Sequence, residues 1–216
     1  MNTLKITAGA LLIGVVIGII VAAIRSSYDK NKDTMKLRGG IGYRVLAVIN
    51  AICKVYLTVV RGTPVVVQLL IAYFLIFQSS TNGVMVASIA FGINSGAYVA
   101  EIIRAGILAV DKGQMEAGRA LGLTNAQTMV YIIIPQAIKN VLPPLGNEFI
   151  VLIKETSVAG VIAVTDLTKA AQYVGSATWR ILPPLYVAAG CYLIMVLGLT
   201  KLLNIFERRL AQGDHN

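Results

Sequence analysis

The chain has 216 residues, of which 56% are hydrophobic and only 13% are charged. Soluble domains carry about 25% charged residues, so this composition excludes a soluble protein and predicts an integral membrane protein. The net charge of +9 would suggest nucleic-acid binding in a soluble protein. In a membrane protein it indicates basic loops that set the topology and meet anionic lipid, so nucleic acid is not an expected partner.

Few residues of the chain could carry redox, metal or nucleotide chemistry. Cys53 and Cys191 are isolated, and the single histidine, His215, lies in the polar tail. This pattern indicates neither a disulfide framework nor a metal site, and it argues against a haem, iron–sulfur or other intramembrane enzyme. The pattern GxxxxGK[ST] does not occur, so a P-loop that binds ATP is not expected in this chain.

The first expected span covers about residues 4–24. Residues 6–24 contain no charge, and this stretch is long enough to cross a hydrocarbon core of about 30 Å. A cleaved signal peptide is the alternative, but the apolar core of such a peptide is usually only about 7–15 residues long. We therefore expect an uncleaved span, followed by a polar, basic loop over residues 25–40.

Residues 41–61 are the ambiguous part of the chain. Wound as a helix, they place five polar side chains within an arc of about 120°. These residues are Arg44, Asn50, Lys54, Thr58 and Arg61. A charge near the centre of a span costs about 2.5–3.5 kcal/mol on insertion scales. A helix that lies at the interface or enters the bilayer obliquely avoids most of this cost, so we expect an elbow and not a separate crossing.

Further spans are expected after the elbow. Thr63 and Pro64 suit the N-cap and the first position of a helix, so the second span is placed at residues 63–79. The remaining spans are placed at residues 84–107, 136–162 and 185–206. Residues 166–180 are expected to form an external loop, in which Trp179 could anchor the chain at the membrane interface.

Residues 110–135 are expected to form a polar loop with two short helices. Gly122 falls where a left-handed cap would end the first helix, and Thr124 and Gln127 have the spacing of a capping box that opens the second. Pro135 then bends or ends the second helix. Two short helices held at a membrane surface suit docking better than catalysis, although the alternative is an ordinary helical loop.

The candidate docking residues are Glu116, Ala117, Gly118, Arg119, Ala120, Leu121, Gly122 and Leu123. The small residues among them, Ala117, Gly118, Ala120 and Gly122, would form a surface that another protein can approach closely.

Basic residues are unequally distributed between the two sides that five spans define. The loop after the first span, the elbow, the docking loop and the C-terminal tail all fall on one side and hold most of them. The opposite side has only Lys5, Lys169 and Arg180. Because basic residues concentrate in cytoplasmic loops, we expect the N-terminus outside and residues 110–135 and the C-terminus in the cytoplasm.

Polar side chains inside spans are functional candidates, because hydrocarbon rarely tolerates them without a role. In the third span, the spacing of Asn94, Tyr98 and Glu101 places them on one helix face. The alternatives are that Tyr98 only packs, and that Glu101 only pairs with Arg104 one turn further on, near the cytoplasmic interface.

The fourth span carries a second polar face. Glu148 and Glu155 are seven residues apart and share a face, with Asn147 and Lys154 beside them. The alternative is that Lys154 and Glu155 form a structural ion pair between helices. The prolines at residues 143–144 are expected to interrupt this span and to free backbone carbonyls, as in the broken helices that line polar pathways in transporters.

Together, the two faces predict an aqueous pathway for a polar solute of amino-acid size. Its cationic part would meet Glu148 or Glu155, and its carboxylate would meet Lys154 or helix N-terminal amides. Two carboxylates on one face favour a basic or strongly polar amino acid. The alternative is a channel or secondary carrier driven by an ion gradient, with Glu101, Glu148 and Glu155 as proton or ion sites.

Several segments match one family in order along the chain. Glu116-Ala117, Gly122 ten positions before Ile132, and Ile134-Pro135 resemble the EAA loop of bacterial ABC importer permeases. The companion matches are Arg61-Gly62-Thr63-Pro64, Ala97-Tyr98 with Glu101 and Arg104, Lys112-Gly113-Gln114, Pro143-Pro144-Leu145-Gly146-Asn147 and Lys154-Glu155-Thr156-Ser157. Over roughly residues 2–210 the chain resembles the permeases for polar amino acids (the histidine, glutamine, glutamate and arginine group). Gly118 and Ile134 stand where the pattern usually has alanine and leucine.

The resemblance implies an all-α integral membrane permease with five transmembrane helices and a cytoplasmic coupling-helix loop, in one domain over residues 1–216. It also implies that this chain lies in the cytoplasmic membrane and has three kinds of protein partner. These are a second permease of the same or similar sequence, two cytoplasmic ATP-binding-cassette ATPases that hold ATP and Mg²⁺, and an extracytoplasmic solute-binding protein. The mechanism would be alternating access driven by the ATPases, so we expect this chain to have no cofactor and no catalytic residues of its own.

Overall fold

The structure of the chain is a computed structural model that describes residues 2–38 and 40–212. This part of the chain consists of helices joined by turns, without a strand, which confirms the predicted all-α fold. His215 lies outside the described residues. In chain order the elements are α1 (Asn2–Arg38), α2 (Ile41–Gly62), α3 (Val65–Ile71), the π-helix η1 (Ala72–Ile76), α4 (Gly83–Leu108), α5 (Lys112–Ala120), α6 (Asn125–Thr128), the π-helix η2 (Met129–Ile133), α7 (Ile134–Glu155), the 3₁₀-helix η3 (Thr156–Ile162), α8 (Leu167–Thr178) and α9 (Leu182–Gln212).

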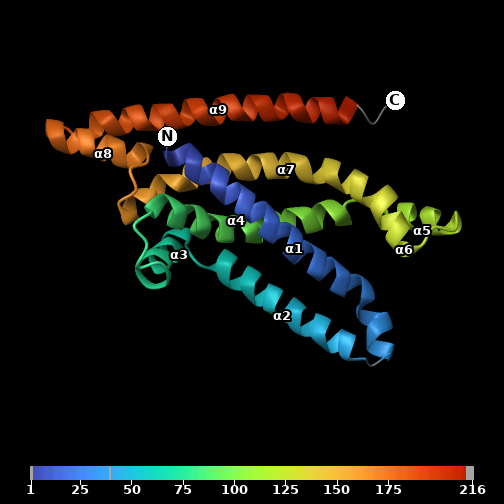
Figure 1. Cartoon of the computed structure of the whole chain (residues 1–216). Coiled ribbons are helices and arrows are strands. Elements are labelled where there is room, and N and C mark those ends of the chain that lie inside the picture. The colour runs from blue at the N-terminus through green and yellow to red at the C-terminus, as the bar shows by residue number, and fades with distance from the viewer. Residues whose placement is uncertain (1, 39, 213–216) are drawn as a thin grey trace.

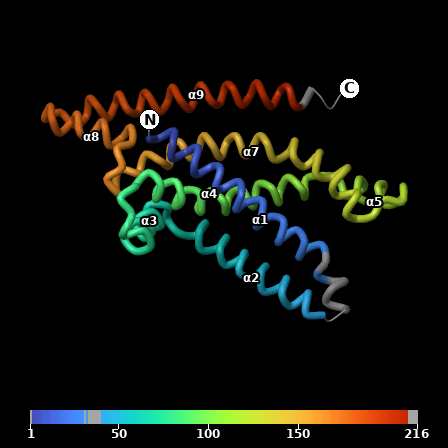
Figure 2. Tube along the Cα trace, viewed as in Figure 1, coloured from blue at the N-terminus to red at the C-terminus, as the bar shows by residue number. Residues whose placement is uncertain are grey.

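The long helices run back and forth between two ends of the molecule (Figures 1 and 2). The N-terminus, α3 and α8 lie at one end, on the left of Figure 1. The start of α2, the α5–α6 pair and the C-terminal end of α9 lie at the other end, on the right. The docking loop and the described end of α9 are therefore on the same side of the molecule, as the predicted topology requires.

In the described part of the chain, four helices are long and apolar enough to cross a membrane. They are the segments Asn2–Lys30, Ile41–Gly62, Gly83–Leu108 and Leu182–Leu210. α7 does not belong to this set, although its 22 residues extend over about 33 Å. It carries the charged residues Lys139, Glu148, Lys154 and Glu155, so it is polar for a membrane helix.

The second crossing differs from the sequence prediction. The expected elbow is α2, an uninterrupted helix of 22 residues that is a candidate span. The expected span at residues 63–79 instead contains α3 and η1, with seven and five residues, and Pro64 is the N-cap residue instead of Thr63. Twelve helical residues extend over about 18 Å, which is too short for a hydrocarbon core of about 30 Å. Length therefore favours α2 as the crossing helix.

Two later expectations also need correction. Pro143 and Pro144 lie inside α7, which continues without interruption to Glu155. Residues 166–180 are not a loop, because they contain α8, which is capped by the Asp166 side chain. Trp179 ends α8 in a left-handed conformation and is 93% exposed, so its anchoring at the interface stays a prediction.

The centre of the fold is the packed pair α1 and α4. Each helix carries two glycines spaced by four residues, Gly14 and Gly18 on α1 and Gly92 and Gly96 on α4. A Cβ atom added to Gly92 would lie 2.7 Å from Ile13 Cβ and 3.2 Å from the backbone oxygen of Ala10. Small residues at this spacing let two membrane helices approach closely, and here they bring the polar face of α4 next to α1.

Candidate translocation and docking sites

The polar face of α4 is directed at the break between α2 and α3. Asn94 is buried, and its Nδ2 donates a hydrogen bond of 2.9 Å to Gln68 Oε1 of α3. Gln68 Nε2 in turn donates to the backbone oxygen of Val60 at 2.8 Å and to Thr63 Oγ1 at 2.7 Å. Asn94 thus helps to hold the end of α2, the start of α3 and the middle of α4 together. Gln68 is not among the residues predicted from the sequence, because its only signal there is an amide within an apolar run.

Glu101 pairs with α1 and not with its own helix. Its Oε1 accepts a hydrogen bond of 2.8 Å from Arg25 Nη1. Arg104, the expected partner, donates instead to Asp29 Oδ2 at 2.7 Å. The alternative of a Glu101–Arg104 pair is therefore wrong. Two ion pairs, one turn apart on each helix, tie α1 to α4.

A polar cavity of about 450 Å³ lies between α1, α2 and α4. Its lining residues are Arg25, Lys54, Leu57, Thr58, Arg61, Gly62 and Glu101. Arg61 Cζ also lies 5.5 Å from the centroid of the Tyr98 ring, which is a cation–π contact. The polar stripe that suggested an interfacial helix over residues 41–61 therefore serves, in part, to line a cavity within the protein.

The polar residues of α7 do not join this cavity. Glu148 is buried, and its Oε1 accepts a hydrogen bond of 2.7 Å from Ser95 Oγ of α4. Ser95 follows Asn94 directly, so the two side chains point about 100° apart around α4. The two predicted faces are therefore separate. Asn94, Tyr98 and Glu101 lie on the side of α4 that meets α1, α2 and α3. Glu148 lies where α7 packs on another side of α4.

The other three candidate residues of α7 are more accessible than Glu148. Asn147 and Lys154 are exposed, and Glu155 is half-buried. In the described part of the chain, no carboxylate lies within ion-pair distance of Lys154, so the alternative of a Lys154–Glu155 ion pair is not found within this subunit. Exposed polar groups on a membrane helix need water or another subunit to cover them.

Replacing Ser95 by alanine is expected to lower the stability of the purified permease. The buried Glu148 carboxylate would lose its hydroxyl donor, a loss of about 1–3 kcal/mol. The midpoint of thermal unfolding in detergent measures this effect. Ser88→Ala is the matched control, because the Ser88 hydroxyl donates only to the backbone oxygen of Val84 in its own helix. Equal midpoints for the two variants would contradict the assigned role of Ser95.

The first docking helix begins and ends as local sequence predicts. Asp111 Oδ1 accepts from the Gly113 backbone N–H at 2.6 Å and caps α5. At the other end, Gly122 has φ +85°, and the backbone N–H groups of Gly122 and Leu123 donate to the oxygens of Arg119 and Gly118. This pair of bonds is a Schellman motif with glycine at its left-handed position, so the predicted cap is confirmed.

The second docking helix begins with the predicted capping box. The Thr124 backbone N–H donates to Gln127 Oε1 at 2.9 Å, and the Gln127 N–H donates to Thr124 Oγ1 at 3.3 Å. Pro135 does not end this helix. α6 continues through η2 into α7, and Pro135 lies in the first turn of α7, directly after the π-helical segment. A π-helical turn is a usual way to accommodate an irregularity within a helix.

α7 is held against α4 near its middle. Asn140 Nδ2 donates a hydrogen bond of 3.3 Å to the backbone oxygen of Gly106. A Cβ atom on Gly106 would collide with the side chain of Val141, so the two helices are in close contact at this point.

The candidate docking residues do not all face outward. Gly118 is buried, and a Cβ atom there would lie 2.5 Å from Thr128 Cγ2. The expectation that Gly118 contributes to an approachable surface is therefore wrong, since it lets α5 pack on the second docking helix. The exposed residues are Glu116, Ala117, Arg119, Ala120, Leu121 and Gly122, while Leu123 is half-buried. Leu121 is 81% exposed, so its apolar side chain is accessible to a partner protein.

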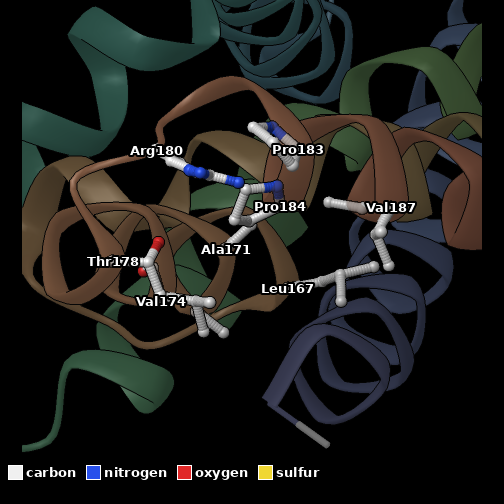
Figure 3. Close-up of a pocket in the computed structure, with 10 residues that line it drawn as sticks. Leu167, Ala171, Val174, Thr178, Arg180, Pro183, Pro184 and Val187 are labelled. Atoms are coloured by element: carbon white, nitrogen blue, oxygen red, sulfur yellow. The ribbon is translucent and has the colours of Figure 1, made fainter.

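A second cavity, of about 690 Å³, lies between α8 and α9. Figure 3 shows Leu167, Val174 and Val187 around it, with Arg180 between the two helices. Its lining is apolar apart from Thr178 and Arg180, and none of the candidate substrate-binding residues lines it. An apolar cavity of this kind suits lipid chains better than a polar solute, so the cavity beside Glu101 is the better candidate for translocation.

Comparison with known proteins places these features in a family. A sequence model of the family described as "Binding-protein-dependent transport system inner membrane component" matches residues 39–212. The putative glutamine transport system permease protein GlnP of Rickettsia bellii is 39% identical over 211 residues, which cover 96% of this chain and 89% of the relative. The arginine transport system permease protein ArtQ of Bacillus subtilis is 38% identical over 215 residues, with coverages of 98% and 90%.

Solved structures show the same fold. A crystal structure of an amino acid ABC transporter with histidines contains a chain that is 45% identical, with a TM-score of 0.83 and coverages of 96% of this chain and 90% of that chain. The MetNI methionine ABC transporter in an inward-facing conformation contains a chain with a TM-score of 0.74 at 17% identity, with coverages of 97% and 93%. The second likeness shows the fold alone.

Proposed function

Because the chain belongs to the binding-protein-dependent transport system inner membrane component family and is the permease subunit of an amino-acid ABC importer, we propose that it carries a polar amino acid of the glutamine or arginine class. The observation that supports this proposal most directly is the polar cavity between α1, α2 and α4, three helices that are each long and apolar enough to cross a membrane. Family membership argues against the alternative of a carrier driven by an ion gradient.

The preference for a basic amino acid has less support than the sequence suggested. It depended on Glu148 and Glu155 facing a solute together, but Glu148 is buried and engaged by Ser95. Within the candidate binding set, Glu101 lines the cavity and Tyr98 contacts its lining residue Arg61. Asn94 is hydrogen-bonded to Gln68, while Asn147, Lys154 and Glu155 lie on α7. The proposed substrate is therefore a polar amino acid, with arginine and glutamine as the first to be tested.

The energy for transport comes, in this proposal, from ATP and Mg²⁺ bound to two partner ATPases. Their docking site is the exposed part of the segment from Glu116 to Leu123. A second permease subunit pairs with this chain and covers exposed polar groups such as Asn147 and Lys154, and a solute-binding protein delivers substrate from outside. Most basic loops lie at the end that carries α5 and α6, which supports a cytoplasmic position for that end and an external N-terminus.

Proteoliposomes that contain this permease, its partner ATPase and the solute-binding protein are expected to accumulate radiolabelled arginine or glutamine only when ATP is present. An ATPase variant without its P-loop lysine is the matched control and should abolish accumulation. Uptake driven by a pH gradient without ATP would overturn the proposal in favour of a secondary carrier. A complex that hydrolyses ATP but accumulates neither amino acid would overturn the proposed substrate class.

A further inference from the structure

The cavity between α1, α2 and α4 carries an excess of positive charge. Its lining includes three cations, Arg25, Lys54 and Arg61, and one carboxylate, Glu101. Arg25 and Glu101 form an ion pair of 2.8 Å, so they neutralise each other. A ligand's ammonium group therefore gains little from Glu101, whose charge is already compensated.

The two remaining cations have no counter-ion within the described residues. No carboxylate of the described residues lies within ion-pair distance of Lys54 or Arg61, and Arg61 contacts the ring of Tyr98. Both side chains are exposed, and both belong to α2, a helix long and apolar enough to cross the membrane. Uncompensated charges on a membrane helix are costly, and they usually mark a path for ions or substrates.

We propose that this cavity binds the α-carboxylate of the transported amino acid, with Lys54 and Arg61 as its charged donors. This inference rests on the proposed function, since it concerns the same substrate. An anion would supply the missing counter-charge, and a guanidinium can hold a carboxylate through two parallel hydrogen bonds. A volume of about 450 Å³ lies within the usual range of small-ligand pockets, about 300–1,000 Å³. Thr58 also lines the cavity, and its hydroxyl could supply a further donor.

A carboxylate site of this kind would determine which ligands the membrane cavity selects. A carboxylate is common to all amino acids, so a site built from Lys54 and Arg61 recognises the amino-acid backbone and not a particular side chain. The membrane site then excludes amines and cations that lack the carboxylate. Discrimination between amino-acid side chains takes place elsewhere along the transport cycle.

Equilibrium binding to the permease–ATPase complex, without the solute-binding protein, tests this inference. The complex is placed in nanodiscs of neutral phosphatidylcholine, and the ligands are radiolabelled arginine and agmatine, which is arginine without its carboxylate. The variants are Lys54→Gln and Arg61→Gln, with Lys54→Arg and Arg61→Lys to retain the charges. Arg44→Gln is the matched control, because Arg44 lies on the same stripe of α2 but does not line the cavity.

The wild-type complex is expected to bind arginine at least about tenfold more tightly than agmatine, since a charge-assisted contact contributes a factor of this order. Lys54→Gln and Arg61→Gln should remove this preference, whereas Arg44→Gln and the charge-retaining variants should keep most of it. Equal binding of arginine and agmatine by the wild type would overturn the inference, whether or not the variants fold. Wild-type affinity for arginine in both glutamine variants would also overturn the inference.

A lipid phosphate is the competing anion, and a second lipid composition separates it from the substrate. If phosphatidylglycerol binds to the wild type and is lost from the two glutamine variants, while arginine affinity is unchanged, the cavity is a lipid site and the inference is wrong. ATP-driven uptake by the wild type, measured in parallel, distinguishes this failure from a failure of the proposed function.

Discussion

Replacing Leu121 by glutamate is expected to abolish ATP-driven uptake while the permease stays folded and inserted. Leu121 is 81% exposed at the end of α5, within the segment proposed to dock the ATPases. Burial of a leucine side chain in an interface contributes about 1.5–3 kcal/mol, and a buried unpaired carboxylate adds a further penalty. The measurements are uptake into proteoliposomes and the amount of ATPase that co-purifies with the permease.

The control for this variant is Leu121→Met, which retains an apolar side chain of similar size and should preserve uptake. Gly122 is a less informative target, because its φ of +85° would strain any other residue and disturb the cap of α5. If Leu121→Glu supports uptake at the wild-type rate and binds the ATPase normally, the docking role of this segment is wrong.

Replacing Gly92 by leucine is expected to prevent assembly of a stable permease. A Cβ atom at this position already lies 2.7 Å from Ile13 and 3.2 Å from the backbone oxygen of Ala10, so α1 and α4 would have to separate. Overpacking of a tight core costs about 1–3 kcal/mol when side chains can adjust, and more when backbone must move. The yield of monodisperse protein and its thermal midpoint in detergent report the effect.

Gly198→Leu is the matched control for the variant at Gly92. Gly198 lies on α9, and an added Cβ atom there has no neighbour within 4 Å in the described structure. This substitution should leave the yield and midpoint of the single subunit close to those of the wild type. Equal behaviour of the two glycine variants would show that the α1–α4 contact is looser than described.

The docking loop was the most predictable part of the fold, because its determinants are local. The glycine cap at Gly122 and the capping box of Thr124 and Gln127 depend on residues only a few positions apart. A single sequence contains all of this information. The burial of Gly118 was not predictable in the same way. It depends on contact with Thr128, which lies across the turn between the two helices.

The sequence predicted an elbow over residues 41–61 because the contact that accounts for their polar side chains is not local. Because of charged residues such as Lys54 and Arg61, residues 41–61 were predicted to be too polar for a membrane-spanning helix. The structure lets them line a cavity between α1 and α4, and no property of residues 41–61 alone reveals this neighbour. For the same reason, the spacing of Glu101 and Arg104 suggested a pair, although each is bound to a residue of α1 that is far away in sequence.

The unbroken path from α6 through η2 to α7 has a mechanical consequence. From Asn125 to Glu155 the chain forms one continuous helical segment, about 46 Å long, without an intervening loop. The contact between Asn140 and Gly106 lies near the midpoint, with 15 residues, or about 22 Å, on each side. The Ser95–Glu148 hydrogen bond holds α7 to α4 a second time, eight residues further along. A displacement of the docking loop would therefore pass along one continuous helix to both contacts with α4, without a loop to absorb it.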